Sequence, residues 1–308
     1  MACIICDCNS ALSNTGTKCT PVMGVAEKLI FVPLKDSSGS ENRINLLNDT
    51  LTDVYVDAKI NNSDWSKRWY ITPSLKNVTS EKADAKVETF NDGAMAFIQE
   101  GERTFTGLFV KGTPKLKGAI DQLRCVPVGL YIIDKNGSLI GEKIGDYLYP
   151  IALENGSVQA KMVFSNDSAI QKVEIKFNFA HTSKDENLRM IKCDSIPANL
   201  LTKEGLIDVD YTVVELTDDT VTVSLFADDG LTTDPIEITG LAQTDFAITC
   251  GDGNSEVAGT IDLFSETNGT YTIEFAPSQP MTVTYVKVTI TKAGFDFAIN
   301  GVELPVSS

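Results

Sequence analysis

The chain has 308 residues, of which 43% are hydrophobic and 22% are charged, and its formal net charge is −16. This length exceeds that of most single β domains and suits two domains. No apolar run approaches the ~18 to 20 residues that a membrane-spanning helix needs, so we expect no membrane span.

The acidic residues are concentrated in the last third of the chain. Residues 201–308 contain 18 acidic side chains and three lysines, whereas residues 1–200 are nearly neutral. We expect regions with such different charge densities to form separate domains, residues 22–200 and residues 201–308, joined near residues 196–199. An acidic domain without arginine is expected to be soluble and to avoid nucleic acid.

Residues 1–21 form a polar, cysteine-rich arm without hydrophobic periodicity. The spacing of Cys3 and Cys6 would let them share a zinc ion, but Cys19 has no second cysteine close to it, so an arm ordered by assembly is favoured over a metal site. The segment lacks the features of a signal peptide. We therefore expect synthesis and retention in a cytosol, where the seven cysteines would be thiols.

Residues 27–34 predict a strand, and Pro33 near its end is typical of a sheet edge. Residues 35–63 are rich in Ser, Asn, Asp and Gly, with one alternating piece at 54–56, which is typical of a long functional or partner-ordered loop. Aromatic residues beside basic ones then favour a contact surface between subunits over stacking on nucleic-acid bases, because no further basic patch surrounds them. These candidate interface residues are Trp65, Arg68, Trp69 and Tyr70.

Two alternating segments, residues 86–98 and 158–179, predict β-hairpins with turns at 91–93 and 166–168. Each hairpin would have one apolar and one polar face. Between the hairpins, Thr113 caps a predicted short helix that begins at Pro114. The polar positions of the two hairpins are Lys86, Glu88, Gln159, Lys161, Lys172, Glu174 and Lys176.

Nothing in the sequence indicates an enzyme. The single histidine, His181, lies in a polar segment, and no nucleotide-binding loop or nucleophile elbow is present. Residues 134–137 are expected to form a hairpin turn, and an exposed turn is favoured over a calcium loop at residues 251–256. We therefore expect no catalytic residue, no cofactor and no bound metal.

Residues 201–308 contain short, threonine-rich segments at intervals of about ten residues, which is typical of an immunoglobulin-like (Ig-like) β-sandwich. Residues 268–275 resemble a strand common in bacterial and phage Ig-like modules. The whole sequence predicts a mainly β protein, in which an N-terminal β-sandwich or barrel with one short α-helix precedes the Ig-like sandwich. The predicted strands of the last domain are 211–214, 220–226, 245–249, 260–264, 271–275 and 283–290.

This order of parts resembles the major tail tube protein of long-tailed double-stranded DNA bacteriophages, in which alternating hairpins with one helix can precede an Ig-like module. The resemblance implies a virion protein, made in the host cytoplasm, that forms stacked hexameric rings with DNA only as passing cargo during ejection. It implies that the polar hairpin positions line the channel and that residues 1–21 and 35–72 join subunits and rings. Other tail proteins, such as the tape measure and terminator proteins, would be further partners.

Two alternatives stay open. Another phage structural subunit, such as a head decoration or baseplate protein, shares much of this composition. An Ig-like adhesin would instead bind host surface glycans through the acidic domain, so that deleting residues 201–308 would abolish attachment, whereas tube assembly would survive the deletion under the tail tube hypothesis.

Overall fold

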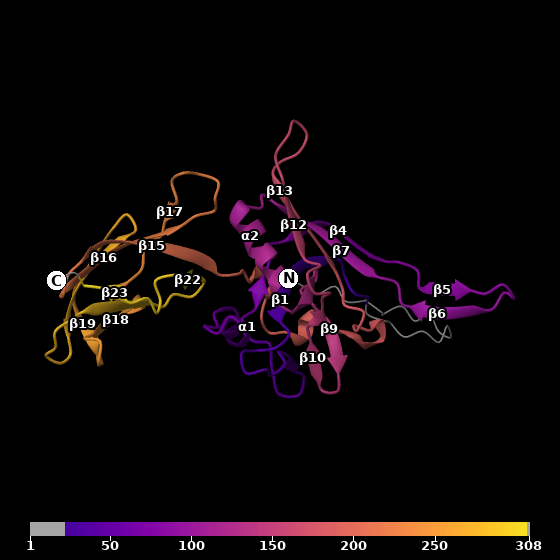
Figure 1. Cartoon of the computed structure of the whole chain (residues 1–308), viewed down its shortest axis with the longest axis horizontal. Coiled ribbons are helices and arrows are strands. Elements are labelled where there is room, and N and C mark those ends of the chain that lie inside the picture. Colours follow the sequence, from indigo (N-terminus) through magenta and orange to yellow (C-terminus); the bar gives the residue numbers. More distant parts are fainter. Residues whose placement is uncertain (1–21, 307–308) are drawn as a thin grey trace. The chain divides into compact units, whose positions relative to one another are not determined.

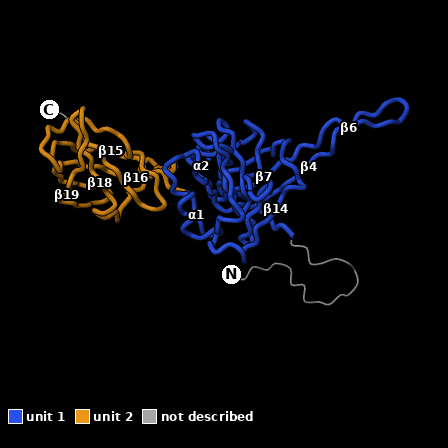
Figure 2. Tube along the Cα trace, turned by 90° about the horizontal axis from the view of Figure 1, so that it is seen from below, with its two compact units in different colours: residues 1–205 blue, residues 206–308 orange. Residues whose placement is uncertain are grey.

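The computed structural model describes residues 22–306, and the chain divides into two compact units between Gly205 and Leu206 (Figure 2). Strands account for 47% of the protein and helices for 11%, so the predicted mainly β, two-domain fold is confirmed. The linker predicted at residues 196–199 is wrong, because Ile196 and Ala198 are buried within the first unit. The arm predicted at residues 1–21, with its cysteines, lies outside the described residues.

The first unit contains a large sheet of eight strands. Figure 1 labels three of them, β1, β9 and β10. Its main path runs β2-β10-β9-β8-β1-β3, with β11 paired to β8 and β14 paired to β9. β1 pairs with β8 on one side and with β3 on the other, so the prediction that this strand lies at a sheet edge is wrong. The bounds are β1 Ala26–Pro33, β2 Ile44–Asn45, β3 Tyr70–Ile71, β8 Val128–Asp134, β9 Leu139–Ile144, β10 Tyr147–Tyr149, β11 Ile151–Ala152 and β14 Leu188–Ile191.

A second, four-stranded sheet has the order β12-β13-β7-β4, and all its pairs are antiparallel. β12 and β13 form the hairpin predicted for residues 158–179. The hairpin predicted for residues 86–98 is also present, but its strands β5 and β6 form a separate two-stranded sheet. The bounds are β4 Leu75–Lys82, β5 Lys86–Thr89, β6 Met95–Gln99, β7 Arg103–Val110, β12 Gln159–Val163 and β13 Lys172–Asn178.

The two larger sheets of the first unit share one hydrophobic core. Phe31 of β1 packs edge to face against Phe177 of β13, with the ring centroids 6.1 Å apart. Phe177 also stacks on Phe105 of β7 at 4.8 Å. Fully burying a side chain of this size contributes about 1.5–3 kcal/mol. Because inward and outward residues alternate along a strand, this packing turns the intervening residues of β13 toward the other face of the sheet.

Helix α2, Pro114–Gln122, confirms the predicted helix. The Thr113 Oγ1 atom accepts a hydrogen bond from the Leu116 N–H at 3.2 Å, Pro114 lies in the first turn, and Ile120 is buried on the core. Thr113 therefore supplies the N-cap that the sequence indicated.

A second helix, α1 (Asp53–Ile60), corrects two predictions, namely a single helix in this domain and an alternating piece at residues 54–56. Thr52 caps the helix by accepting the Tyr55 N–H at 3.2 Å. Only Val56 and Ile60 are buried, four residues apart on one helical face. A window of three residues cannot reveal that spacing.

The last residues of the first unit are fastened to β1 and α1. The Lys28 Nζ atom donates a hydrogen bond to the Lys203 carbonyl oxygen at 2.7 Å, and the Lys203 Nζ atom lies 2.7 Å from Asp57 Oδ1. Gly205 follows, and it passes so close to β3 that an added Cβ would lie 2.8 Å from the Ile71 carbonyl oxygen. The chain leaves the first unit at this glycine.

The second unit is all β, and its nine strands form one sheet by pairing, with a separate core. The path runs β22-β15-β16-β20-β19-β18-β21-β23, with β17 paired to β16. Each predicted strand overlaps an observed one. Tyr271 is fully buried, and its hydroxyl donates a hydrogen bond to the Ile238 carbonyl oxygen at 2.9 Å. The bounds are β15 Ile207–Leu216, β16 Thr220–Ala227, β17 Ile236–Glu237, β18 Phe246–Gly251, β19 Glu256–Thr267, β20 Thr270–Pro277, β21 Tyr285–Ile290, β22 Phe295–Phe297 and β23 Leu304–Pro305.

Candidate assembly surfaces

The four-stranded sheet brings five of the seven predicted polar hairpin residues onto one face. Along β13, Val173, Ile175 and Phe177 are fully buried, so the residues between them lie on the opposite face. On β12, the exposed Gln159 pairs with Lys176, so the two strands share this polar face. The five residues are Gln159, Lys161, Lys172, Glu174 and Lys176.

The polar face continues across β7 and β4. Lys176 lies beside Thr106 of β7, and Glu174 lies beside Leu108. Lys76 of β4 is the next neighbour of Leu108. The face is therefore a mixture of lysine, glutamate, threonine and leucine. On it Gln159, Lys161 and Lys176 are exposed, whereas Lys172 and Glu174 are half-buried.

Both outer edges of this sheet lack a partner strand within the described residues. Part of the β12 edge is occupied by side chains, because Arg124 Nε donates to the Val158 carbonyl oxygen at 3.0 Å and the Asp121 carboxylate accepts the Ala160 N–H. The backbone N–H and C=O groups of alternate residues point to the same side of a strand. Because the Ala160 N–H points to this edge, the N–H and C=O groups of Met162 do so as well. An exposed edge of this kind is a template for pairing with another chain.

Residues 83–102 form a β-hairpin that extends from the first unit (Figure 1). This hairpin, which is distinct from residues 1–21, is called the arm from here on. Every residue of β5 is exposed, and the side chains of Met95, Phe97 and Ile98 on β6 are exposed as well, Phe97 at 61%. Lys86 and Glu88 lie on this arm. The structure therefore separates these two predicted residues from the five on the four-stranded sheet, and the two hairpins do not make one surface within a single chain.

The predicted aromatic interface divides into one surface residue and one core residue. Trp65 is 56% exposed, whereas Trp69 is only 4% exposed and packs against Tyr55 and Tyr131 at centroid distances of 6.2 and 5.7 Å. Trp69 therefore belongs to the core of the single chain, where Tyr55 of α1 covers it. Tyr70 lies on β3, where its hydroxyl donates to the Trp65 carbonyl oxygen at 3.0 Å.

Arg68 has an intramolecular role as well. Its Nε atom donates a hydrogen bond to the Asn62 carbonyl oxygen at 2.8 Å, which closes the loop that carries Trp65. Of the four predicted interface residues, Trp65 alone presents most of its side chain to solvent.

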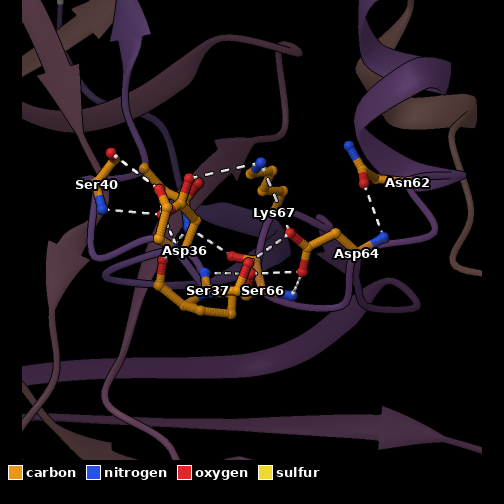
Figure 3. A network of polar contacts seen from close by, with 10 residues as sticks. Asp36, Ser37, Ser40, Asn62, Asp64, Ser66 and Lys67 are labelled. Carbon is orange, nitrogen blue, oxygen red and sulfur yellow. Dashed lines mark hydrogen bonds and ion pairs between the residues drawn. The ribbon is translucent and has the colours of Figure 1, made fainter.

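A network of polar contacts holds the Trp65 loop against the loop after β1 (Figure 3). Buried Ser66 is at its centre, where its Oγ atom accepts the Ser37 N–H at 2.8 Å and donates to Asp64 Oδ1 at 2.6 Å. Lys67 Nζ lies 3.7 Å from both Asp36 Oδ2 and Asp64 Oδ2. The hydrogen bond from Ser66 lowers the pKa of Asp64. These contacts fix the position from which Trp65 projects.

The residue considered for catalysis lies at the surface, and the segment considered for calcium binding forms a hydrogen-bonded turn. His181 is exposed and lines a pocket of about 440 Å³, in which Ser183 donates its hydroxyl to Glu142 at 3.1 Å. Within residues 22–306, no group of three acidic, histidine or cysteine side chains is placed to hold a metal ion. Asp252 accepts the N–H groups of Asn254 and Ser255, as in an exposed turn.

The described cysteines differ in state. Cys125 and Cys250 are free, and burial raises the pKa of Cys250. Cys193 is disulfide-bonded, so the prediction that all seven cysteines are thiols is wrong.

Comparisons with known proteins give no identity for this chain. No protein-family model, no curated protein and no solved structure matches it. Among the described residues, no helix has the length and apolar character needed to cross a membrane.

Sequence reasoning missed an ion-pair cluster at the base of the arm, formed by Lys82, Glu100, Arg103 and Asp185. Asp185 lies 103 positions from Lys82 in the chain, so no local spacing could have linked them. The one available signal was the presence of charged residues at both ends of the predicted hairpin.

Proposed function

We propose that this chain is a structural virion subunit that assembles with copies of itself into hexameric rings, which stack into the tail tube of a bacteriophage. The observation that carries the proposal is the arm. Its apolar side chains, among them Met95, Phe97 and Ile98, are exposed in one copy, while the core of the first unit is complete without them. Exposed apolar groups gathered on one element mark a surface for another protein.

The four-stranded sheet offers a second argument for assembly. One copy has an open edge at β12 and another at β4, on opposite sides of the same sheet. Two different edges that pair with each other make a head-to-tail interface, and such interfaces close into rings when the rotation permits. Closure into a continuous barrel removes the exposed edges altogether.

In this arrangement the polar face of the four-stranded sheet would line the channel through which DNA passes. Its charge weighs partly against the proposal, because the lysines at 161, 172 and 176 outnumber Glu174, and lysines attract phosphate. Lys161 lies directly opposite Glu174, which reduces that excess locally.

Electron microscopy tests the proposal directly. We expect the purified full-length chain to form rings or tubes in negative stain, and a double variant M95D/F97D to remain folded but unassembled, because a charge on the arm opposes burial of its apolar side chains. The matched control is Leu263→Asp, which changes an exposed leucine of β19 in the second unit and should leave assembly intact. A wild-type protein that stays monomeric at every concentration in light scattering contradicts the proposal.

A further inference from the structure

The arm joins the four-stranded sheet at a narrow root. The ladder between β4 and β7 ends at the pair Lys82 and Arg103, and the separate ladder between β5 and β6 begins at the pair Lys86 and Gln99. Between the two ladders, the Ala83 N–H donates to the Glu102 carbonyl oxygen at 2.9 Å. The regular ladder is interrupted at this junction, and a hairpin can change direction at such a point.

One carboxylate bridges both strands at this root. Asp185 Oδ2 lies 3.0 Å from Lys82 Nζ at the end of β4, and Asp185 Oδ1 lies 2.6 Å from Arg103 Nη2 at the start of β7. Lys82 Nζ also lies 2.9 Å from Glu100 Oε2 on the arm itself. Hydrogen bonds from Lys82 to Glu100 and Asp185 raise the pKa of this lysine, which stays charged at neutral pH.

Asp185 is itself held in place by the large sheet. It begins the 3-10 turn Asp185–Asn187, and the buried Glu142 of β9 accepts hydrogen bonds from Ser183 Oγ at 3.1 Å, Lys184 N at 3.2 Å and Asn187 Nδ2 at 3.2 Å. Hydrogen bonds to a carboxylate are roughly twice as strong as neutral ones. The loop that carries Asp185 is thus anchored to a different sheet from the one that carries the arm.

We propose that Asp185 is a positioning residue that fixes the direction of the arm, and that removing or screening its two ion pairs lets the arm turn about its root. The pocket of about 440 Å³ beside the root, lined by Lys82, Arg103 and Asp185, leaves space for that movement. An arm with a fixed direction can meet a neighbouring subunit without first being ordered, which lowers the entropic cost of association. This last step rests on the proposed function, whereas the positioning itself does not.

Hydrogen exchange on the full-length protein tests the positioning role. In Asp185→Asn we expect exchange at residues 80–84 and 100–104 to become about three- to tenfold faster, the effect of losing two partly exposed ion pairs. The matched control is Asp167→Asn, the same change at an exposed position in the turn between β12 and β13. Asp185→Glu keeps the charge and should restore part of the protection. In the wild type, ~1 M salt should accelerate exchange at the root, because exposed ion pairs are screened.

The outcomes separate the two proposals. Equal exchange at the root in D185N and D167N, together with no effect of salt on the wild type, overturns the positioning role even if the protein forms tubes. Faster exchange in D185N in a protein that never assembles supports the positioning role and contradicts the proposed function. If both proposals hold, D185N assembles more slowly than D167N in light scattering, while the tryptophan fluorescence of the two folded variants is the same.

Discussion

Phe31 and Phe177 meet edge to face across the two sheets of the first unit, with ring centroids 6.1 Å apart. Each ring is almost completely buried, and each comes from the interior of its sheet. This contact sets the orientation of β13, and through it the side of the sheet on which Glu174 and Lys176 lie. The position of the polar face therefore depends on an aromatic contact in the core.

Truncating that contact should destabilise the first unit. We expect Phe177→Ala to lower the free energy of unfolding by about 3–5 kcal/mol, because it removes a fully buried ring and leaves a cavity. Phe164→Ala, in the turn between β12 and β13 where the side chain is 74% exposed, should change it by less than about 0.5 kcal/mol. Urea unfolding followed by tryptophan fluorescence measures both, since Trp65 and Trp69 lie in the first unit. Equal midpoints for the two variants would contradict this description of the core.

Acrylamide should quench the fluorescence of the two tryptophans to very different extents. Trp69→Phe leaves the exposed Trp65 as the only emitter, so acrylamide should quench its fluorescence strongly, whereas Trp65→Phe leaves the buried Trp69 and should give weak quenching. Trp69→Ala should lower the free energy of unfolding by about 3–5 kcal/mol. A Trp65→Ala variant with the same loss would show that the loop carrying Trp65 is packed differently.

Replacing either of two glycines near α2 by alanine should change the stability of the protein, in opposite directions at the two positions. Gly118 lies within α2, and an added Cβ would meet nothing within 4 Å, so Gly118→Ala should stabilise the protein by about 0.5–1 kcal/mol through helix propensity. At Gly112 the same Cβ would lie 2.6 Å from Val173 Cγ2, so Gly112→Ala should destabilise the protein. The urea midpoints of the two variants should lie on either side of the wild-type value; a lower midpoint for G118A would refute the assigned geometry of α2.

In the second unit, Glu256 and Lys287 should link stability to pH. The hydrogen bond from Lys287 lowers the pKa of Glu256, so the stability it contributes is present above the ordinary glutamate pKa and is lost as the pH falls through the lowered value. Hydrogen bonds to Glu256 and Glu303 raise the pKa of Lys287 to about 12, so its contribution is complete below the ordinary lysine pKa and is lost as the pH rises through about 12.

Calorimetry checks this linkage. At pH 7 we expect Glu256→Gln to lower the Tm of the second unit by a few degrees. We expect the difference from wild type to shrink as the pH is lowered to about 2.5, because protonation of the Glu256 carboxyl removes its ion pair with Lys287. The control Glu237→Gln changes an exposed glutamate of β17. A difference between E256Q and wild type that stays constant down to that pH would mean that the ion pair does not stabilise the fold.

Local patterns predicted the elements of this protein better than their arrangement. Thr113 and Pro114 marked the start of α2 because capping is a local property. Alternation likewise predicted the hairpins and their polar faces. Alternation does not determine which sheet a hairpin joins, and for this reason Lys86 and Glu88 were placed with residues that lie on a different sheet.

The candidate surfaces were predicted only in part, because burial is decided by distant residues. Trp65 and Trp69 lie four residues apart in one short segment of the sequence, yet α1 covers Trp69 and leaves Trp65 exposed. The position of Asp185 depends on Glu142 in another strand. The spacing of neighbouring residues in the sequence indicates neither of these contacts.

The fastening of Lys203 to β1 and α1 has a mechanical consequence. Tension applied to the chain beyond Gly205 reaches Lys28 and Asp57 first, in a strand flanked by two others and in a helix packed on the core. The load is thus carried first by β1 and α1, within the first unit. A foreign domain fused after Gly205 in place of residues 206–308 would load the same contacts of Lys203. This glycine is therefore a suitable fusion site.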